Sequence, residues 1–202
     1  MVPFAFHKKP GRVLFYNLKG IKINELKSDP GFLLGLNGYY HEDKKINYAL
    51  VSNSYGIYVY NIINYTLYNK FIPKIKSLKS TSFSEGHIIE IEEKIILAGP
   101  LFSEGFLYLW NLISKDLFKL IKLSYGLTDI CIWSNNYIFA TYNGSIKDKF
   151  VLININDKEI EKGFGYEEIE KTCYGIKLLR NRIEGEFLIT YNSEGKLYLY
   201  KI

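Results

Sequence analysis

The apolar residues of this chain form short runs separated by polar turns, and one run recurs five times. Each copy ends in an aromatic or apolar residue, followed by Asn or Lys and then by Ile or Leu. The copies are Val13–Leu18, Tyr58–Ile62, Leu107–Leu112, Val151–Ile155 and Leu197–Ile202. We call the Asn or Lys of each copy the marker residue: Asn17, Asn61, Asn111, Asn154 and Lys201. Successive markers are 44, 50, 43 and 47 residues apart, so the chain is built from repeats.

Further apolar runs divide each repeat into four short strands. A Gly-bearing turn and a second run precede the marker run, as in Phe187–Thr190 followed by Asn192–Gly195, and this pattern predicts a hairpin. An inner run lies upstream, and a polar-alternating run such as Thr66–Phe71 follows, as expected of an outer strand with one wet face. No stretch has sustained helical periodicity. Repeats of this length with several strands are typical of propeller blades.

We therefore predict an all-β fold of four-stranded antiparallel blades. The expected blades are 1–27, 28–72, 86–122, 126–163 and 172–202, within a single domain or fragment spanning 1–202. The first and last are partial, with three strands each, and Phe4–Phe6 is expected to form the second strand of the first blade. Three full and two partial blades make an incomplete or open ring. We expect a partner chain, or the rest of a larger protein, to complete it, because uncovered blade faces favour association.

The repeat resembles the WD40 repeat, whose third strand ends in Trp-Asp. Gly105–Leu112, which contains Trp110-Asn111, is the best match; Tyr16-Asn17, Tyr60-Asn61, Ile153-Asn154 and Tyr200-Lys201 match less well. The resemblance implies that the His of Gly86-His87 belongs to a buried hydrogen-bond network with an Asp and a Trp. Asp129 is the candidate Asp, but it falls in a different repeat from His87, so the network is incomplete in every repeat.

The same resemblance implies a non-catalytic scaffold that binds other proteins through turns on the blade faces. Candidate residues for this face are Asn53, Tyr55, Phe102, Glu104, Asn143 and Asn192. The alternative for each position is a plain turn residue. Aromatic residues such as Tyr55 and Phe102 are enriched at binding hot spots, so they are the expected anchors.

A second candidate is a lysine-rich loop that would face an anion. It contains Lys70, Lys74, Lys76 and Lys79, with several serines among them. An acidic peptide, a phosphate-bearing partner or an acidic lipid headgroup would suit it, and a solvated connection is the alternative. The net charge of +5 comes from mixed signs along the whole chain. We therefore do not expect the concentrated basic face of a nucleic-acid-binding protein.

The sequence contains no constellation typical of an enzyme. His7, His41 and His87 have no metal-ligand spacing, and we interpret His41-Glu42-Asp43 as a solvated turn. We predict no catalytic residue, no metal and no cofactor; a propeller-type enzyme or a truncated fragment of a larger protein are the alternatives.

Trp110 and Trp133 are expected to pack between blades, and Cys131 and Cys173 to be small buried residues. With no secretory signal and no apolar stretch of about 18 residues, the cytoplasm, or the nucleus, is the expected location.

Overall fold

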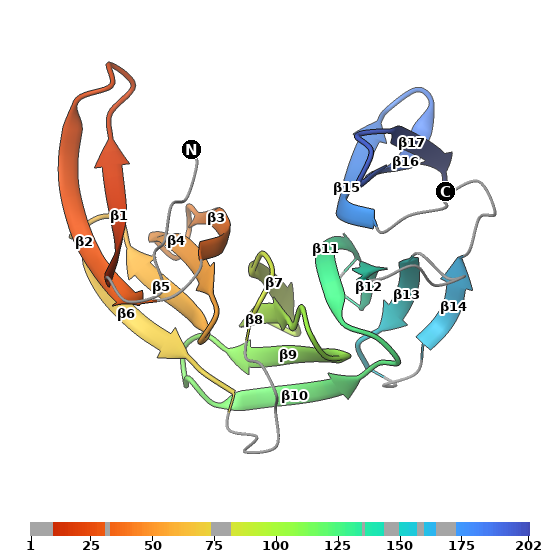
Figure 1. The fold of residues 1–202 in the computed structure, drawn as a ribbon, viewed down its shortest axis with the longest axis horizontal. Coiled ribbons are helices and arrows are strands. Elements are labelled where there is room, and N and C mark those ends of the chain that lie inside the picture. Colours follow the sequence, from red (N-terminus) through yellow and green to blue (C-terminus); the bar gives the residue numbers. More distant parts are fainter. Residues whose placement is uncertain are drawn as a thin grey trace. The chain divides into compact units, whose positions relative to one another are not determined.

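All regular elements of the described residues are β-strands, which confirms the predicted all-β fold (Figure 1). The computed structural model describes residues 10–30, 33–73, 82–134, 136–143, 150–156, 160–164 and 173–202. The chain divides into two compact units, Met1–Gly86 and His87–Ile202, and each is described by itself. The predicted strand Phe4–Phe6 lies outside the described residues.

The described residues of unit 1 form two antiparallel sheets. The first is a hairpin of β1 (Pro10–Tyr16) and β2 (Lys22–Pro30). The second has four strands in chain order: β3 (Leu33–His41), β4 (Ile46–Asn53), β5 (Ile57–Asn61) and β6 (Thr66–Phe71). Each strand pairs with its neighbour in sequence, so short turns are enough to connect them.

The described residues of unit 2 form three further antiparallel sheets, again with strands in chain order. The first has strands β7 (His87–Ile91), β8 (Lys94–Pro100), β9 (Phe106–Asn111) and β10 (Leu117–Lys122). The second has β11 (Leu127–Ser134), β12 (Tyr137–Tyr142), β13 (Phe150–Asn154) and β14 (Ile160–Phe164). The third has β15 (Cys173–Asn181), β16 (Gly185–Asn192) and β17 (Leu197–Lys201). Three sheets of four strands, flanked by sheets of two and three, confirm the predicted blade-like fold class.

Burial explains why the middle strands are apolar throughout and the last strands are not. In β9 and β13 the side chains are buried on both faces of the sheet. The fourth strands β6 and β10 bury only part of their side chains. Their polar alternation is that of strands with one face in water, as the sequence predicted.

The marker asparagines each end a third strand and hold the turn that follows. Asn111 Oδ1 accepts hydrogen bonds from the N–H groups of Ile113 (2.9 Å) and Ser114 (3.0 Å). The amide oxygens of Asn17, Asn61 and Asn154 accept equivalent bonds from their own turns. The residue after the marker then donates its N–H to a carbonyl at the start of the second strand; Leu112, for example, bonds Ile95 at 2.8 Å. The marker therefore recurs because it closes the end of each sheet.

Successive sheets pack face to face, and the same marker-relative positions meet each time. In unit 1, Val13 and Phe15 of β1 pack with Tyr58 and Tyr60 of β5. In unit 2, Leu107 and Leu109 of β9 share a core with Val151 and Ile153 of β13. Phe150 and Leu152 of β13 share the next core with Tyr200 of β17. In the first two cases residues four and two before one marker thus share a core with residues three and one before the next, and in the last case with Tyr200, one before the next marker. We call this the packing rule.

Candidate protein-interaction surfaces

In unit 1, the predicted turn residues Asn53 and Tyr55 have different roles. Asn53 is fully buried, and its Oδ1 accepts hydrogen bonds from the N–H groups of Tyr55 (2.8 Å) and Gly56 (3.0 Å). This amide oxygen therefore holds the turn between β4 and β5. Tyr55 is 50% exposed at the tip of that turn and offers its ring to solvent.

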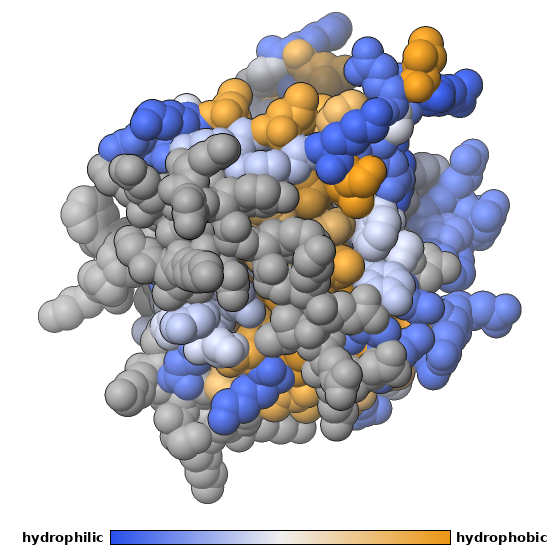
Figure 2. Space-filling model, turned by 90° about the vertical axis from the view of Figure 1, so that its right-hand side faces the viewer, coloured by the Kyte–Doolittle hydropathy of each residue, from blue (hydrophilic) through white to orange (hydrophobic). Residues whose placement is uncertain are grey.

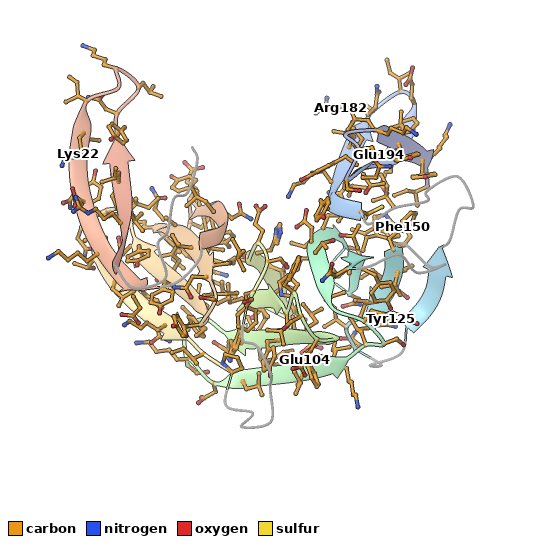
Figure 3. All side chains as sticks on the ribbon, viewed as in Figure 1. Lys22, Glu104, Tyr125, Phe150, Arg182 and Glu194 are labelled. Carbon is orange, nitrogen blue, oxygen red and sulfur yellow. The ribbon has the colours of Figure 1, made fainter. Side chains whose placement is uncertain are left out.

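In unit 2, Phe102, Glu104 and Asn143 come together with a residue that the sequence did not reveal, Tyr125. Asn143 Nδ2 donates to the carbonyl oxygen of Phe102 at 3.2 Å, and the Asn143 N–H donates to Gly126 at 2.7 Å. Phe102 and Glu104 are half-buried in the turn between β8 and β9, and Tyr125 is 47% exposed. Figure 3 labels Glu104 and Tyr125. We call Phe102, Glu104, Tyr125 and Asn143 the turn cluster.

Backbone contacts make the turn cluster rigid. A Cβ added to Gly126 would lie 2.1 Å from the carbonyl oxygen of Phe102, so only glycine permits the two segments to approach this closely. The ring of Tyr125 rests edge-on against Tyr142, with centroids 5.5 Å apart. The exposed aromatic group is therefore held in place before any partner arrives.

Asn192, also predicted on the binding face, is buried at the end of β16, next to the turn that leads to β17. Its Oδ1 accepts hydrogen bonds from the N–H groups of Glu194 and Lys196, both at 3.0 Å, and its Nδ2 donates to the hydroxyl of Tyr198. Like Asn53, it holds a turn rather than presenting its amide to solvent.

Lys70, the first lysine of the predicted anion-facing loop, lies in strand β6. Its Nζ is 2.8 Å from Asp29 Oδ2, and Asp29 also accepts a 2.7 Å hydrogen bond from the hydroxyl of Tyr58. The hydrogen bond from Lys70 has the larger effect and the one from Tyr58 the smaller, and together they hold the pKa of the Asp29 carboxyl below its usual value. The charge of Lys70 is thus engaged within unit 1. Lys74, Lys76 and Lys79 lie outside the described residues.

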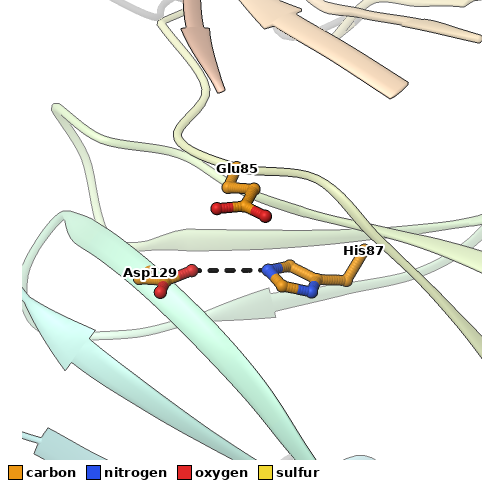
Figure 4. Close-up of side chains that lie close together, drawn as sticks. All are labelled: Glu85, His87 and Asp129. Carbon is orange, nitrogen blue, oxygen red and sulfur yellow. Dashed lines mark hydrogen bonds and ion pairs between the residues drawn. The ribbon is translucent and has the colours of Figure 1, made fainter. Parts of the chain in front are cut away.

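A buried polar line joins the inner strands of the three sheets in unit 2. His87 Nε2 of β7 lies 3.3 Å from Asp129 Oδ1 of β11 (Figure 4). Asp129 Oδ2 in turn accepts a 3.0 Å hydrogen bond from the Ile176 N–H of β15. The sequence prediction placed His87 and Asp129 in different repeats, and the structure shows the same. They pair between neighbouring sheets.

The remaining reactive side chains also serve packing. Cys131 and Cys173 are buried free thiols, as predicted, and burial raises the pKa of Cys131 to about 12. Trp133 packs between the second and third sheets of unit 2, and its Nε1–H donates to Glu186 at 2.6 Å. Glu42 and Asp43 are exposed in the turn between β3 and β4, as the solvated-turn interpretation predicted.

Unit 1 contains a groove of about 800 Å³ along strand β1. Its walls include Leu14 and Tyr16 of β1 and Leu34 and Leu36 of β3. Tyr16, Leu34 and Leu36 are each roughly half exposed: 52%, 45% and 47%. Tyr16 and Leu14 share one side of β1, opposite the side that packs on Tyr58, and we call this pair the N-terminal face.

The third sheet of unit 2 carries an exposed apolar surface. We call it the C-terminal face, and its members are Leu179, Phe187, Ile189, Tyr191, Leu197 and Leu199. Leu197 and Leu199 are 74% and 60% exposed. The opposite side of the same sheet, with Ile176 and Leu188, is buried against β11–β14. Figure 2 shows one side of the molecule, on which apolar side chains reach the surface between hydrophilic ones.

Comparison with solved structures agrees with this fold. The crystal structure of Sqt1 from Saccharomyces cerevisiae, a WD40 protein, matches 95% of this chain with a TM-score of 0.73 and 15% sequence identity. The computationally designed Ika8 protein matches 91% with a TM-score of 0.62 and 10% identity. The chain spans about half of each, 53% and 50% of their lengths. At these identities the likeness shows the fold alone.

Sequence comparison does not assign this chain to a protein family. No protein-family model matches the chain. No curated protein matches it. The described residues also contain no helix with the length and apolar character needed to cross a membrane.

Proposed function

We propose that this chain is a non-catalytic scaffold of WD40-like repeats that binds other proteins. The turn cluster is the observation that carries the proposal. The turn between β8 and β9, which carries Phe102, lies against the segment of Tyr125 and Gly126 that joins β10 to β11, and backbone contacts fix both segments. Rigid, partly exposed aromatic groups lose little conformational entropy on binding, which is why they are enriched at binding hot spots.

The other polar groups of unit 2 are engaged in holding the fold, as expected of a scaffold. Asp129 is occupied by a histidine and a backbone N–H, and both cysteines are buried. The free thiols also suit a reducing compartment, the cytoplasm or the nucleus. Partners of this scaffold include a chain that supplies further sheets to the partial propeller.

The proposal is tested by capturing proteins from cells that express the chain. We expect Tyr125→Ser to lose proteins that the wild-type chain retains, because the substitution removes the exposed ring of the turn cluster. Tyr40→Ser is the matched control: Tyr40 is 66% exposed in β3, away from the cluster residues in sequence and in a different unit. Identical sets of captured proteins for all three chains would show that the turn cluster is not a binding site.

A further inference from the structure

The C-terminal face is built like the covered faces of the other sheets, yet it is exposed. In β13, Phe150 and Leu152 stand four and two residues before the marker Asn154, and both are buried against the next sheet. The ring of Phe150, labelled in Figure 3, lies 5.6 Å from that of Tyr200. Leu197 and Leu199 hold the same places before Lys201, but they are exposed. The same positions are thus an established interface one sheet earlier.

The residues around Leu197 and Leu199 extend this face in register. Leu199 lies opposite Ile189, and Leu197 lies opposite Tyr191, in the pairing of β16 with β17. The Tyr191 ring covers Gly175, where an added Cβ would lie 2.3 Å from a ring carbon. The face is therefore a largely apolar surface of three strands, with Lys177 and Lys201 on the same side of the sheet. Exposed apolar surfaces of this kind mark sites of protein association.

The packing rule specifies what would cover this face. In two of the observed interfaces the covering residues stand three and one positions before a marker, as Tyr58 and Tyr60 stand before Asn61. In the third, Tyr200 stands one position before Lys201. Leu14 and Tyr16 hold these two positions before Asn17. They form the N-terminal face, and Tyr16 is 52% exposed. The chain thus carries the marker-relative positions of both halves of one further interface, with Glu25 and Lys22 opposite Leu14 and Tyr16 on the N-terminal side.

We propose that the C-terminal face binds the N-terminal face of a second copy of this chain, head to tail. The inference rests on the proposed function, because it names one protein partner of the scaffold. The positions equivalent to Leu197 and Leu199 one sheet earlier, Phe150 and Leu152, are already covered by a neighbouring sheet. Head-to-tail contacts use two different patches of the subunit, which makes them separable by mutation.

The experiment measures the mass of the full chain in solution by sedimentation velocity over a range of concentrations. The C variant carries Leu197→Lys and Leu199→Lys, and the N variant carries Leu14→Lys and Tyr16→Lys. We expect wild-type chain to associate and each variant alone to be monomeric. An equimolar mixture of the two variants should form a complex of two copies, because each variant supplies the face that the other lacks.

Two controls keep the result interpretable. Ile183→Lys changes a residue that is 94% exposed in the turn between β15 and β16, and it should associate like the wild type. Tyr16→Lys alone replaces the double N variant if circular dichroism shows that the latter is unfolded. A monomeric wild type, an N variant that still associates alone, or a mixture that stays monomeric would each overturn the inference. None of these results would affect binding through Tyr125, so the scaffold proposal is tested separately.

Discussion

At the residue scale, asparagine recurs as the marker because its amide oxygen can accept hydrogen bonds from its own turn. The first N–H groups after a strand have lost their ladder partners and need acceptors. Asn61 meets this need with Ile63 at 2.8 Å, and Asn17 with Lys19 at 2.9 Å. The aspartate of the Trp-Asp pair would have the same acceptor geometry, so the departure from that pair leaves the turn intact.

Replacing a marker asparagine should therefore weaken the fold measurably. Asn111→Ala removes the acceptor for the N–H groups of Ile113 and Ser114. We expect a loss of about 1 kcal/mol in the free energy of unfolding, since such bonds are partly replaced by water. Urea unfolding measures it. Asn156→Ala, at an exposed turn position, is the control and should change stability by less than about 0.5 kcal/mol; an equal loss from both variants would contradict the turn role.

The buried cysteines lead to a second residue-scale prediction. Burial raises the pKa of Cys131 to about 12, so the reactive thiolate is scarce well above neutral pH. Cys173 is fully buried. We expect neither thiol to react with an aromatic disulfide reagent between pH 7 and roughly 9 in native protein, and both to react in urea. Rapid titration of a thiol without denaturant would show that one of them is accessible.

At the element scale, sheets are joined by polar groups as well as by apolar faces. Asp129 accepts hydrogen bonds from a neighbouring sheet and pairs with His87 from another. Its side chain is only 6% exposed. Buried acceptors of this kind are costly to remove, because the donors that face them are left without compensation.

Asp129→Ala should accordingly destabilise unit 2 by about 3 kcal/mol, since it leaves the Ile176 N–H and the imidazole of His87 without this carboxylate. Chemical denaturation of unit 2, followed by the fluorescence of Trp110 and Trp133, measures the effect. Asp116→Ala removes an exposed aspartate from the turn before β10 and should be nearly neutral. If the two variants unfold at the same urea concentration, the buried polar line contributes no stability.

The strands could be predicted from the sequence because each one shows in its own pattern of apolar and polar residues. Contacts between sheets could not, because they join residues that are far apart in the sequence. The alternation of Thr66–Phe71 predicted the wet strand β6 correctly. His87 and Asp129 were both noticed, yet their pairing spans 42 positions and two sheets. No sequence pattern singled out Tyr125, because its position beside the segment of Phe102 depends on residues that are not adjacent in sequence. Asn53 and Asn192 suited an exposed turn equally well, and only the structure shows their amides buried.

At the scale of the whole molecule, repetition makes stability depend on what covers each sheet. A sheet in an array contributes its own hydrogen bonds plus an interface with each neighbour. The β11–β14 sheet contributes to two apolar cores, one with β7–β10 and one with β15–β17. The β15–β17 sheet has the second of these cores on one side and the exposed C-terminal face on the other.

Amide hydrogen exchange should differ between two strands that hold the same position in their sheets, because the faces of those sheets are covered differently. β12 and β16 are both second strands, and each pairs with a neighbour on both edges. Both strands are therefore hydrogen-bonded on both edges, but the faces of their sheets are covered differently. At low concentration we expect amide exchange in β16 to be about 10- to 100-fold faster than in β12, because local opening of β16 exposes less apolar surface that was previously buried.

Raising the protein concentration gives the same experiment a second readout. If a second copy covers the C-terminal face, exchange in β16 and β17 should slow as copies associate, while exchange in β12 should not change, because its sheet is already covered on both sides. The C variant, with Leu197→Lys and Leu199→Lys, should lose this dependence on concentration but keep slow exchange in β12. Equal exchange in β12 and β16 at every concentration would mean that the stability of a sheet does not depend on what covers it.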